Sequence, residues 1–183
     1  YSTSAAKLTG ELGADSLSLP GLASLVIGSI SGQTAGGIWP STRFSPPGPP
    51  PVDVEVTLSA NSFDTGFGAT TGPARMVVNW QPDSMELRDF SGEVLKGKLR
   101  GTLALRRTNG LGSYLGKFTY TGFSVAELLP KSGIAGTADL EFDGGGNGES
   151  LSAFAASLSG GGSLRVKGLV LPGFDVSALG TAT

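Results

Sequence analysis

The chain has 183 residues, with 13 Lys and Arg against 15 Asp and Glu, and a formal net charge of -2. It contains no cysteine and no histidine, which excludes thiol chemistry and an imidazole general base. No basic stripe occurs, and this argues against a nucleic-acid partner. The 30 glycines, 11 prolines and 15% charged residues are typical of a many-stranded β protein with frequent turns.

The first predicted elements are a strand ending near Leu19 and a short apolar helix over 21–27. A long loop over 28–45 and the proline-rich stretch 46–51 follow, and the latter predicts a stiff, extended connector. We place a soft boundary at about residue 50. It separates residues 1–50, the end of a preceding repeat plus a Gly/Pro-rich loop, from a β region over 51–183.

Alternation of apolar and polar residues with a period of two dominates the rest of the chain. One apolar and one polar face per strand is the signature of an antiparallel sheet that is covered on one side. Lys96–Gly97 and Lys167–Gly168 interrupt this alternation and predict tight turns or bulges. The predicted strands are 52–60, 74–80, 98–106, 114–120, 134–142 and 164–167.

Short helices are predicted over 124–129, 150–158 and 175–179. Ser150 can cap the second of these at its N-terminus, and the glycines at 160–162 would end it. A strand followed directly by a short apolar helix is thus predicted three times with similar sequence, at 17–25, 118–129 and 169–179. Such recurrence indicates stacked modules, so we expect the chain to be part of a longer, repeat-built protein.

Two groups of residues invite a chemical interpretation. The glycine-rich stretch 143–149 resembles a phosphate loop or a calcium turn, but it has no lysine and occurs once, so a mobile strand-to-helix connection is favoured. Glu86, Asp89 and Glu93 could supply paired carboxylates for acid–base catalysis. Because lysine and arginine share their strands, charge pairing across strands is favoured instead. We therefore predict no enzyme, no cofactor and no metal site.

The apolar strand faces need a covering layer, and the predicted helices are too short to supply one. Either two sheets face each other as a sandwich, or one sheet curls and leaves an apolar trough. A trough of this kind would hold a ligand, and a lipid gains about 0.8 kcal/mol for each methylene it buries. Composition and periodicity leave these two alternatives open.

The order of motifs in the second half of the chain resembles a known family. The strand 134–142 is followed by a Gly-Asn helix start at 146–154, a Leu-Ser-Gly stop at 158–160 and a tail over 162–175. This order is similar to the C-terminal region of the AsmA family of Gram-negative envelope proteins. The hairpin over 85–103 also resembles that family, with Lys96–Gly97 where two glycines are usual. The resemblance covers roughly residues 52–183.

The resemblance implies a periplasmic protein that is anchored in the inner membrane by a segment outside this chain. It favours the trough: a mainly β, antiparallel, repeat-built curled sheet or groove, like a taco or β-solenoid, with a few short helices. Relatives are thought to carry phospholipid toward the outer membrane or to assist outer-membrane protein assembly. The family has no catalytic residues to carry over.

The leading hypothesis is therefore a non-enzymatic groove along which the acyl chains of phospholipids or other lipids slide. The alternative is a structural β scaffold that uses exposed strand edges to dock an outer-membrane assembly partner or to build an extracellular fibre. The candidate groove residues share the parity of the apolar strand faces; they are Val54, Val56, Leu58, Leu99, Leu103, Leu105, Phe118, Tyr120, Leu140, Phe142, Leu164 and Val166.

Overall fold

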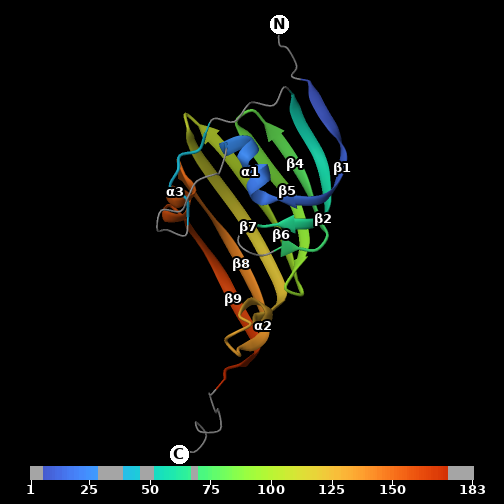
Figure 1. Cartoon of the computed structure of the whole chain (residues 1–183), viewed down its shortest axis with the longest axis vertical. Helices are drawn as coiled ribbons and strands as arrows, with labels where there is room; N and C mark the ends of the chain where they lie inside the picture. Colours follow the sequence, from blue (N-terminus) through green and yellow to red (C-terminus); the bar gives the residue numbers. More distant parts are fainter. Residues whose placement is uncertain (1–5, 29–38, 46–51, 67–69, 173–183) are drawn as a thin grey trace, which may run out of the picture.

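A computed structural model describes residues 6–28, 39–45, 52–66 and 70–172 (Figure 1). Within these ranges nine strands form one open sheet, accompanied by three short helices, so the predicted mainly β fold is confirmed. The sheet order is β1-β2-β4-β5-β6-β7-β8-β9, and the short β3 pairs with β2. The elements are β1 (Lys7–Ser18), α1 (Leu19–Ile27), β2 (Asp53–Asp64), β3 (Thr70–Thr71), β4 (Ala74–Gln81), β5 (Ser84–Val94), β6 (Gly97–Thr108), β7 (Leu111–Ser124), α2 (Val125–Leu128), β8 (Ala135–Gly148), α3 (Leu151–Ala156) and β9 (Ser159–Val170).

Tight hairpins connect the long central strands. Leu95 and Lys96 turn the chain between β5 and β6 with φ of 45° and 66°, as the Lys96–Gly97 signal predicts. Asn109 and Gly110 do the same between β6 and β7, with φ of 51° and 83°. Positive φ at both central residues is the mark of a type I′ turn, whose twist matches that of the flanking strands.

One strand pair departs from the predicted antiparallel pattern. β1 pairs with β2 in parallel, in register from Lys7 opposite Asp53 to Ser18 opposite Asp64. The other pairs are antiparallel. A parallel neighbour needs a crossover: the chain leaves β1 at Ser18 and enters α1, and β2 begins at Asp53, opposite Lys7 at the start of β1. Strands from both sides of residue 50 therefore belong to the same sheet.

The helices begin where serine caps them. Ser18 accepts a hydrogen bond from the backbone N–H of Gly21 at 3.1 Å, and Ser150 accepts one from Ala153 at 3.2 Å. Ser124 caps α2 in the same way. These contacts satisfy backbone donors that a helix start leaves without partners. The helices predicted over 21–27, 124–129 and 150–158 are thus confirmed with shifted ends, while 175–179 lies outside the described residues.

The glycine-rich segments are strands, which corrects two predictions. The stretch 143–149 is not a loop, because β8 continues to Gly148. Gly160–Gly162 lie inside β9 instead of forming the end of the α3 helix, and Gly144 pairs with Gly160. A Cβ on Gly160 would stand 2.3 Å from the carbonyl oxygen of Asp143, so the two strands approach closely there. Because glycine has no side chain, a glycine-rich strand shows no alternation of apolar and polar residues. The sequence pattern therefore did not predict these parts of β8 and β9.

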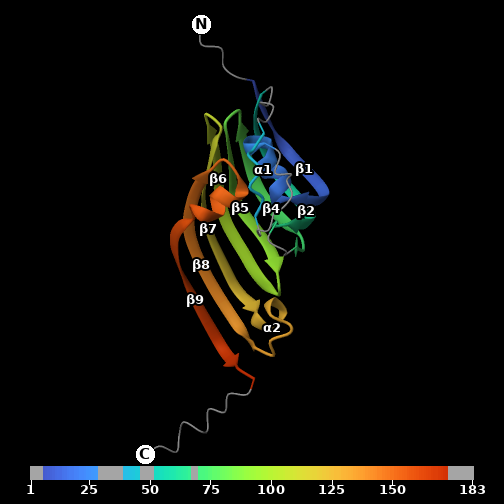
Figure 2. The ribbon, with the colours of Figure 1, turned by 60° about the vertical axis from the view of Figure 1, so that its left-hand side comes forward.

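The core lies on one face of the sheet, here called the inner face and defined by the side chains of Val56, Met76, Leu87 and Leu105. Helix α1 packs on this face over β5 and β6, and its Val26 is fully buried. Figures 1 and 2 show α1 and α3 toward one end of the sheet and α2 at the other. The helices therefore cover the inner face at its two ends.

Arg107 of β6 holds the end of α1 and the segment 39–45 in place over the inner face. Its guanidinium donates hydrogen bonds to the carbonyl oxygens of Ile27 and Ser45, each at 2.7 Å. Phe44 packs edge-on against Phe154 of α3, with ring centroids 5.1 Å apart. The end of α1, the segment 39–45 and α3 are consequently held together over one end of the inner face.

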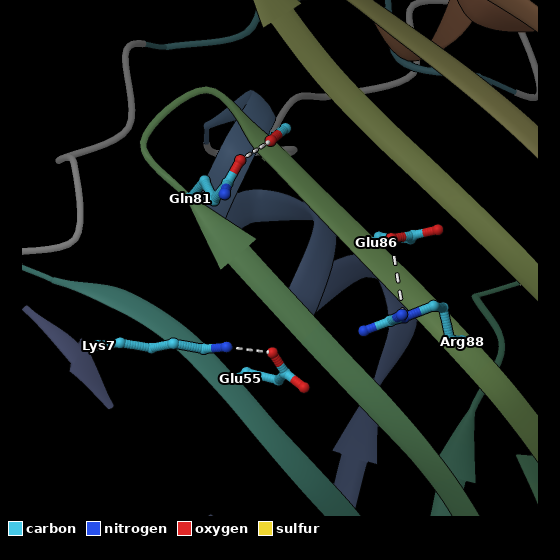
Figure 3. Close-up of polar contacts among 6 residues, drawn as sticks. Lys7, Glu55, Gln81, Glu86 and Arg88 are labelled. Atoms are coloured by element: carbon cyan, nitrogen blue, oxygen red, sulfur yellow. Dashed lines mark hydrogen bonds and ion pairs between the residues drawn. The ribbon is translucent and has the colours of Figure 1, made fainter. Parts of the chain in front are cut away.

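Charged side chains pair on the opposite, outer face (Figure 3). The Lys7 ammonium lies 2.6 Å from the Glu55 carboxylate, and Glu86 lies 3.7 Å from Arg88. Glu93 sits opposite Lys98 in the β5–β6 register. Glu86 thus pairs with an arginine of its own strand instead of across strands, whereas Glu93 occupies the cross-strand position that the prediction favours.

Two members of the predicted charge group lie elsewhere. Asp89, with φ of 53°, occupies a bulge between Leu87 and Phe90. Lys96 lies 2.6 Å from Glu127 of α2, and not beside the strand carboxylates.

A candidate apolar binding site

The inner face holds an apolar hollow between the two covered ends, with a volume of about 390 Å³. Side chains from β2, β5, β6, β7 and β8 and from the start of α1 surround it, and the surface that they present to the hollow is entirely apolar. Its lining comprises Leu19, Phe63, Thr65, Leu87, Phe90, Val94, Leu99, Thr102, Leu103, Phe118, Tyr120, Leu140 and Phe142.

The two sides of the hollow differ. On the side of β2 and β5, Phe63 and Phe90 are buried and their ring centroids lie 5.1 Å apart, with Leu19 of α1 beside them. On the side of β8, Leu140 is 37% exposed, and its neighbour Leu164 on β9 is 64% exposed. The hollow is therefore walled toward β2 and open toward the β9 edge.

Register explains why apolar side chains meet here. Leu99, Tyr120, Leu140 and Leu164 occupy one row across β6, β7, β8 and β9. Cross-strand neighbours in such a row lie on the same face, about 5 Å apart. Phe118 and Phe142 form the next row. The shared parity of the sequence thus becomes a continuous apolar surface across four strands.

The structure divides the predicted groove residues into three groups. Val56, Leu58 and Leu105 are buried in the same core cluster as Val26 and Ile27 of α1, and Val54 packs against that cluster, so none of them lines the hollow. The reason is that α1 lands on this part of the inner face. The residues that do line it are Leu99, Leu103, Phe118, Tyr120, Leu140 and Phe142. Leu164 and Val166 lie on the exposed edge strand β9, opposite Leu140 and Ala138.

The sequence pattern did not predict the residues on the walled side of the hollow, toward β2 and β5. Phe90 and Val94 reach the inner face because the bulge at Asp89 shifts the parity of β5. Phe63 lies beyond the predicted end of its strand at residue 60. Leu19 belongs to α1, and the sequence pattern does not predict where that helix packs on the sheet. A residue with positive φ is the local signal of such a bulge, and an aspartate tolerates it better than most residues.

Tyr120 closes the hollow toward α2. Its hydroxyl donates a hydrogen bond to the carbonyl oxygen of Val94 at 2.6 Å, and its ring stacks on Phe123 with centroids 4.3 Å apart. Burial, followed by the nearby Glu127 carboxylate, raises the pKa of Tyr120 to about 12. The phenol therefore stays neutral at every physiological pH, and its single donor is already used.

This shift predicts an alkaline loss of stability. In the unfolded chain the tyrosine ionises near pH 10, whereas in the folded chain its pKa is about 12. The stabilisation from the neutral buried phenol is hence fully present below pH 10 and is lost as the pH rises toward 12. Urea titrations at pH 8, 10 and 11 should show a decline that the Tyr120→Phe variant reduces. An equal decline in both proteins would contradict the prediction.

A second hollow, of about 700 Å³, is wide and mixed in polarity. Asp15, Asn61 and Arg75 contribute to its lining. The amide of Asn61 donates to Asp15 at 3.4 Å, and Arg75 lies 3.7 Å from Glu11. These polar groups are thus occupied with one another, and we assign no ligand to this hollow.

Among the described residues, no group of three or more acidic side chains stands close enough to hold a metal ion. In the same part of the chain, no helix has the length and apolar character needed to cross a membrane. Comparisons with protein-family models, with curated proteins and with solved structures give no match.

Proposed function

We propose that the inner face is a groove that holds the acyl chain of a lipid, in a non-enzymatic segment of an AsmA-like protein. The single observation that carries this proposal is the apolar hollow, to which the lining presents only apolar surface and which is open toward the β9 edge. The groove works passively: the acyl chain slides along leucine and phenylalanine side chains while the head group stays in water.

The energetic argument is simple. Each methylene removed from water contributes about 0.8 kcal/mol, so ten buried methylenes contribute about 8 kcal/mol before ordering costs are subtracted. The lining presents no polar surface to the hollow, so water there lacks hydrogen-bond partners. An acyl chain is therefore a better occupant than water, and nothing in the lining would bind a polar ligand.

The resemblance of residues 52–183 to the AsmA C-terminal region supports a place for this groove in the cell envelope. On that basis we propose phospholipid transport between inner and outer membranes and a role in outer-membrane homeostasis. The protein would lie in the periplasm, anchored to the inner membrane through a segment outside this chain.

Native mass spectrometry of the gently purified chain tests the proposal. We expect a fraction of the protein to carry phospholipid mass, and we expect that mass to exchange for added fatty acid. A protein that emerges free of lipid, and that takes up none from added vesicles, would contradict the groove.

The unpaired edges of the sheet favour a second candidate, a scaffold that grows or docks by strand addition. In the part of the chain that the structure describes, β1 and β9 end the sheet, and both are largely exposed along their length. Leu12 of β1 and Leu164 of β9 are 57% and 64% exposed. Exposed apolar edge strands are templates for pairing with another strand. Oligomers without lipid in the same spectra would support this scaffold, which could serve outer-membrane assembly or a fibre.

A further inference from the structure

We infer that Gly116, together with Gly101, selects which acyl chains the groove accepts, because these glycines let the ring of Phe118 lie flat on the sheet. The identity of the ligand rests on the proposed function, whereas the position of the ring does not. The inference makes Gly116 a specificity-determining residue, although it has no side chain to touch a ligand.

Phe118 projects from β7 into the row that lines the hollow, and a glycine lies on each side of its ring. A Cβ added to Gly116, two residues earlier on β7, would stand 2.6 Å from Cε2 of Phe118. A Cβ added to Gly101, the partner of Phe118 on β6, would stand 2.5 Å from Cδ1 of the same ring. The ring therefore covers both glycine backbones, in the place where two side chains would otherwise stand.

This arrangement determines the depth of the hollow. A phenylalanine in a strand ordinarily stands away from the sheet, because side chains on its neighbours fill the space at its sides. With glycine at both neighbours the ring can tilt onto the backbone, and the space above it stays open. Phe142 on β8 repeats the pattern, since a Cβ on Gly144 would stand 2.7 Å from its Cζ.

Gly116 is the glycine at which this idea can be tested cleanly. The three nearest atoms that an added Cβ would meet there belong to the side chains of Phe118 and Leu103. At Gly101 and Gly144 the same Cβ would also approach backbone oxygen atoms at 2.6 and 2.7 Å, so alanine there would strain the sheet. Gly116→Ala should therefore raise the ring and leave the strands in place.

Gly161→Ala is the matched control. Gly161 is also a strand glycine, it lies on β9, and an added Cβ there meets nothing within 4 Å. Both variants replace one strand glycine by alanine, but only Gly116→Ala disturbs Phe118. Phe118→Leu provides the opposite change, because it removes the ring and leaves the glycines.

The experiment measures displacement of a fluorescent fatty acid by saturated fatty acids of increasing length and by lysophosphatidylcholines with the same chains. Gly116→Ala should weaken the longest chains by about fourfold for each methylene that the raised ring excludes. Phe118→Leu should strengthen long or branched chains, and Gly161→Ala should match the wild type. Equal effects in both ligand series would identify the acyl chain as the recognised part, and effects confined to lysophosphatidylcholines would identify the phospholipid.

Two results would overturn the inference. One is a Gly116→Ala protein with the same chain-length profile as Gly161→Ala. The other comes from NMR of the unliganded wild type: the Gly101 and Gly116 Hα signals should be shifted upfield by the Phe118 ring, and the shift should vanish in Phe118→Leu. Absence of that shift rejects the flat ring. If the wild type binds no probe but shows the shift, the proposed function fails while the placement of the ring stands.

Discussion

Replacement of Leu103 by glutamate is expected to abolish acyl-chain binding while the sheet remains folded. Leu103 lines the hollow and packs partly against the core. A carboxylate there has no hydrogen-bond partner in the lining, and burying it beneath a hydrocarbon chain costs several kcal/mol. We expect at least a hundredfold weaker binding of fatty acids, together with a loss of about 1–3 kcal/mol in the free energy of unfolding.

Leu115→Glu is the control for this variant. Leu115 lies on the neighbouring strand β7, opposite Ala104, and its side chain is 62% exposed on the outer face. The same charge is added there in water, so binding should be unchanged. Circular dichroism shows whether each protein is folded. If folded Leu103→Glu protein still binds fatty acid like the wild type, acyl chains do not occupy this hollow.

Replacement of Phe154 by alanine should cause the largest loss of stability. Its ring contacts Phe44 and Tyr114, with centroids 5.1 and 4.9 Å away, and an added Cβ on Gly112 would stand 2.8 Å from it. It thereby joins α3, the segment 39–45 and β7. Truncating a buried phenylalanine costs about 3–5 kcal/mol, which is a large share of the stability of a typical domain.

Urea denaturation measures this loss, with Leu158→Ala as the control. Leu158 follows α3 and is 51% exposed, so its truncation should cost less than about 1 kcal/mol. The folded Phe154→Ala protein should keep its affinity for fatty acid, because Phe154 does not line the hollow. Equal losses in the two variants would show that the ring does not hold this end of the inner face together.

Most strands, and many residues of the inner face, could be predicted from the sequence because apolar and polar side chains alternate along a strand that has one buried face. Val56, Leu99 and Leu140 do share one face. Their division between core and hollow could not be read, because it depends on where α1 docks. Helix α1 reaches β5 and β6 across the intervening strands, and such a long-range contact leaves no local pattern.

Bulges in the strands are the second reason why some inner-face residues could not be predicted from the sequence. The parity of β7 changes after Tyr120, where the register shifts and Gly122 has φ of 69°. The backbone N–H of Gly122 donates to Asp139 on β8 at 2.9 Å, so the bulge is held by its neighbour. Phe123 reaches the inner face only because of this shift. A pattern with a strict period of two cannot anticipate an inserted residue.

The parallel pairing of β1 with β2 has a geometric consequence for assembly. An uninterrupted alternation along the eight-strand path would leave the two borders of the sheet pointing in opposite directions. The parallel β1–β2 pair resets that alternation, and β1 and β9 run the same way. A second molecule brought alongside β9 by translation and rotation, without being turned over, would offer its β1 to β9 as a parallel neighbour. Any row formed in this manner would be polar, with every member oriented alike.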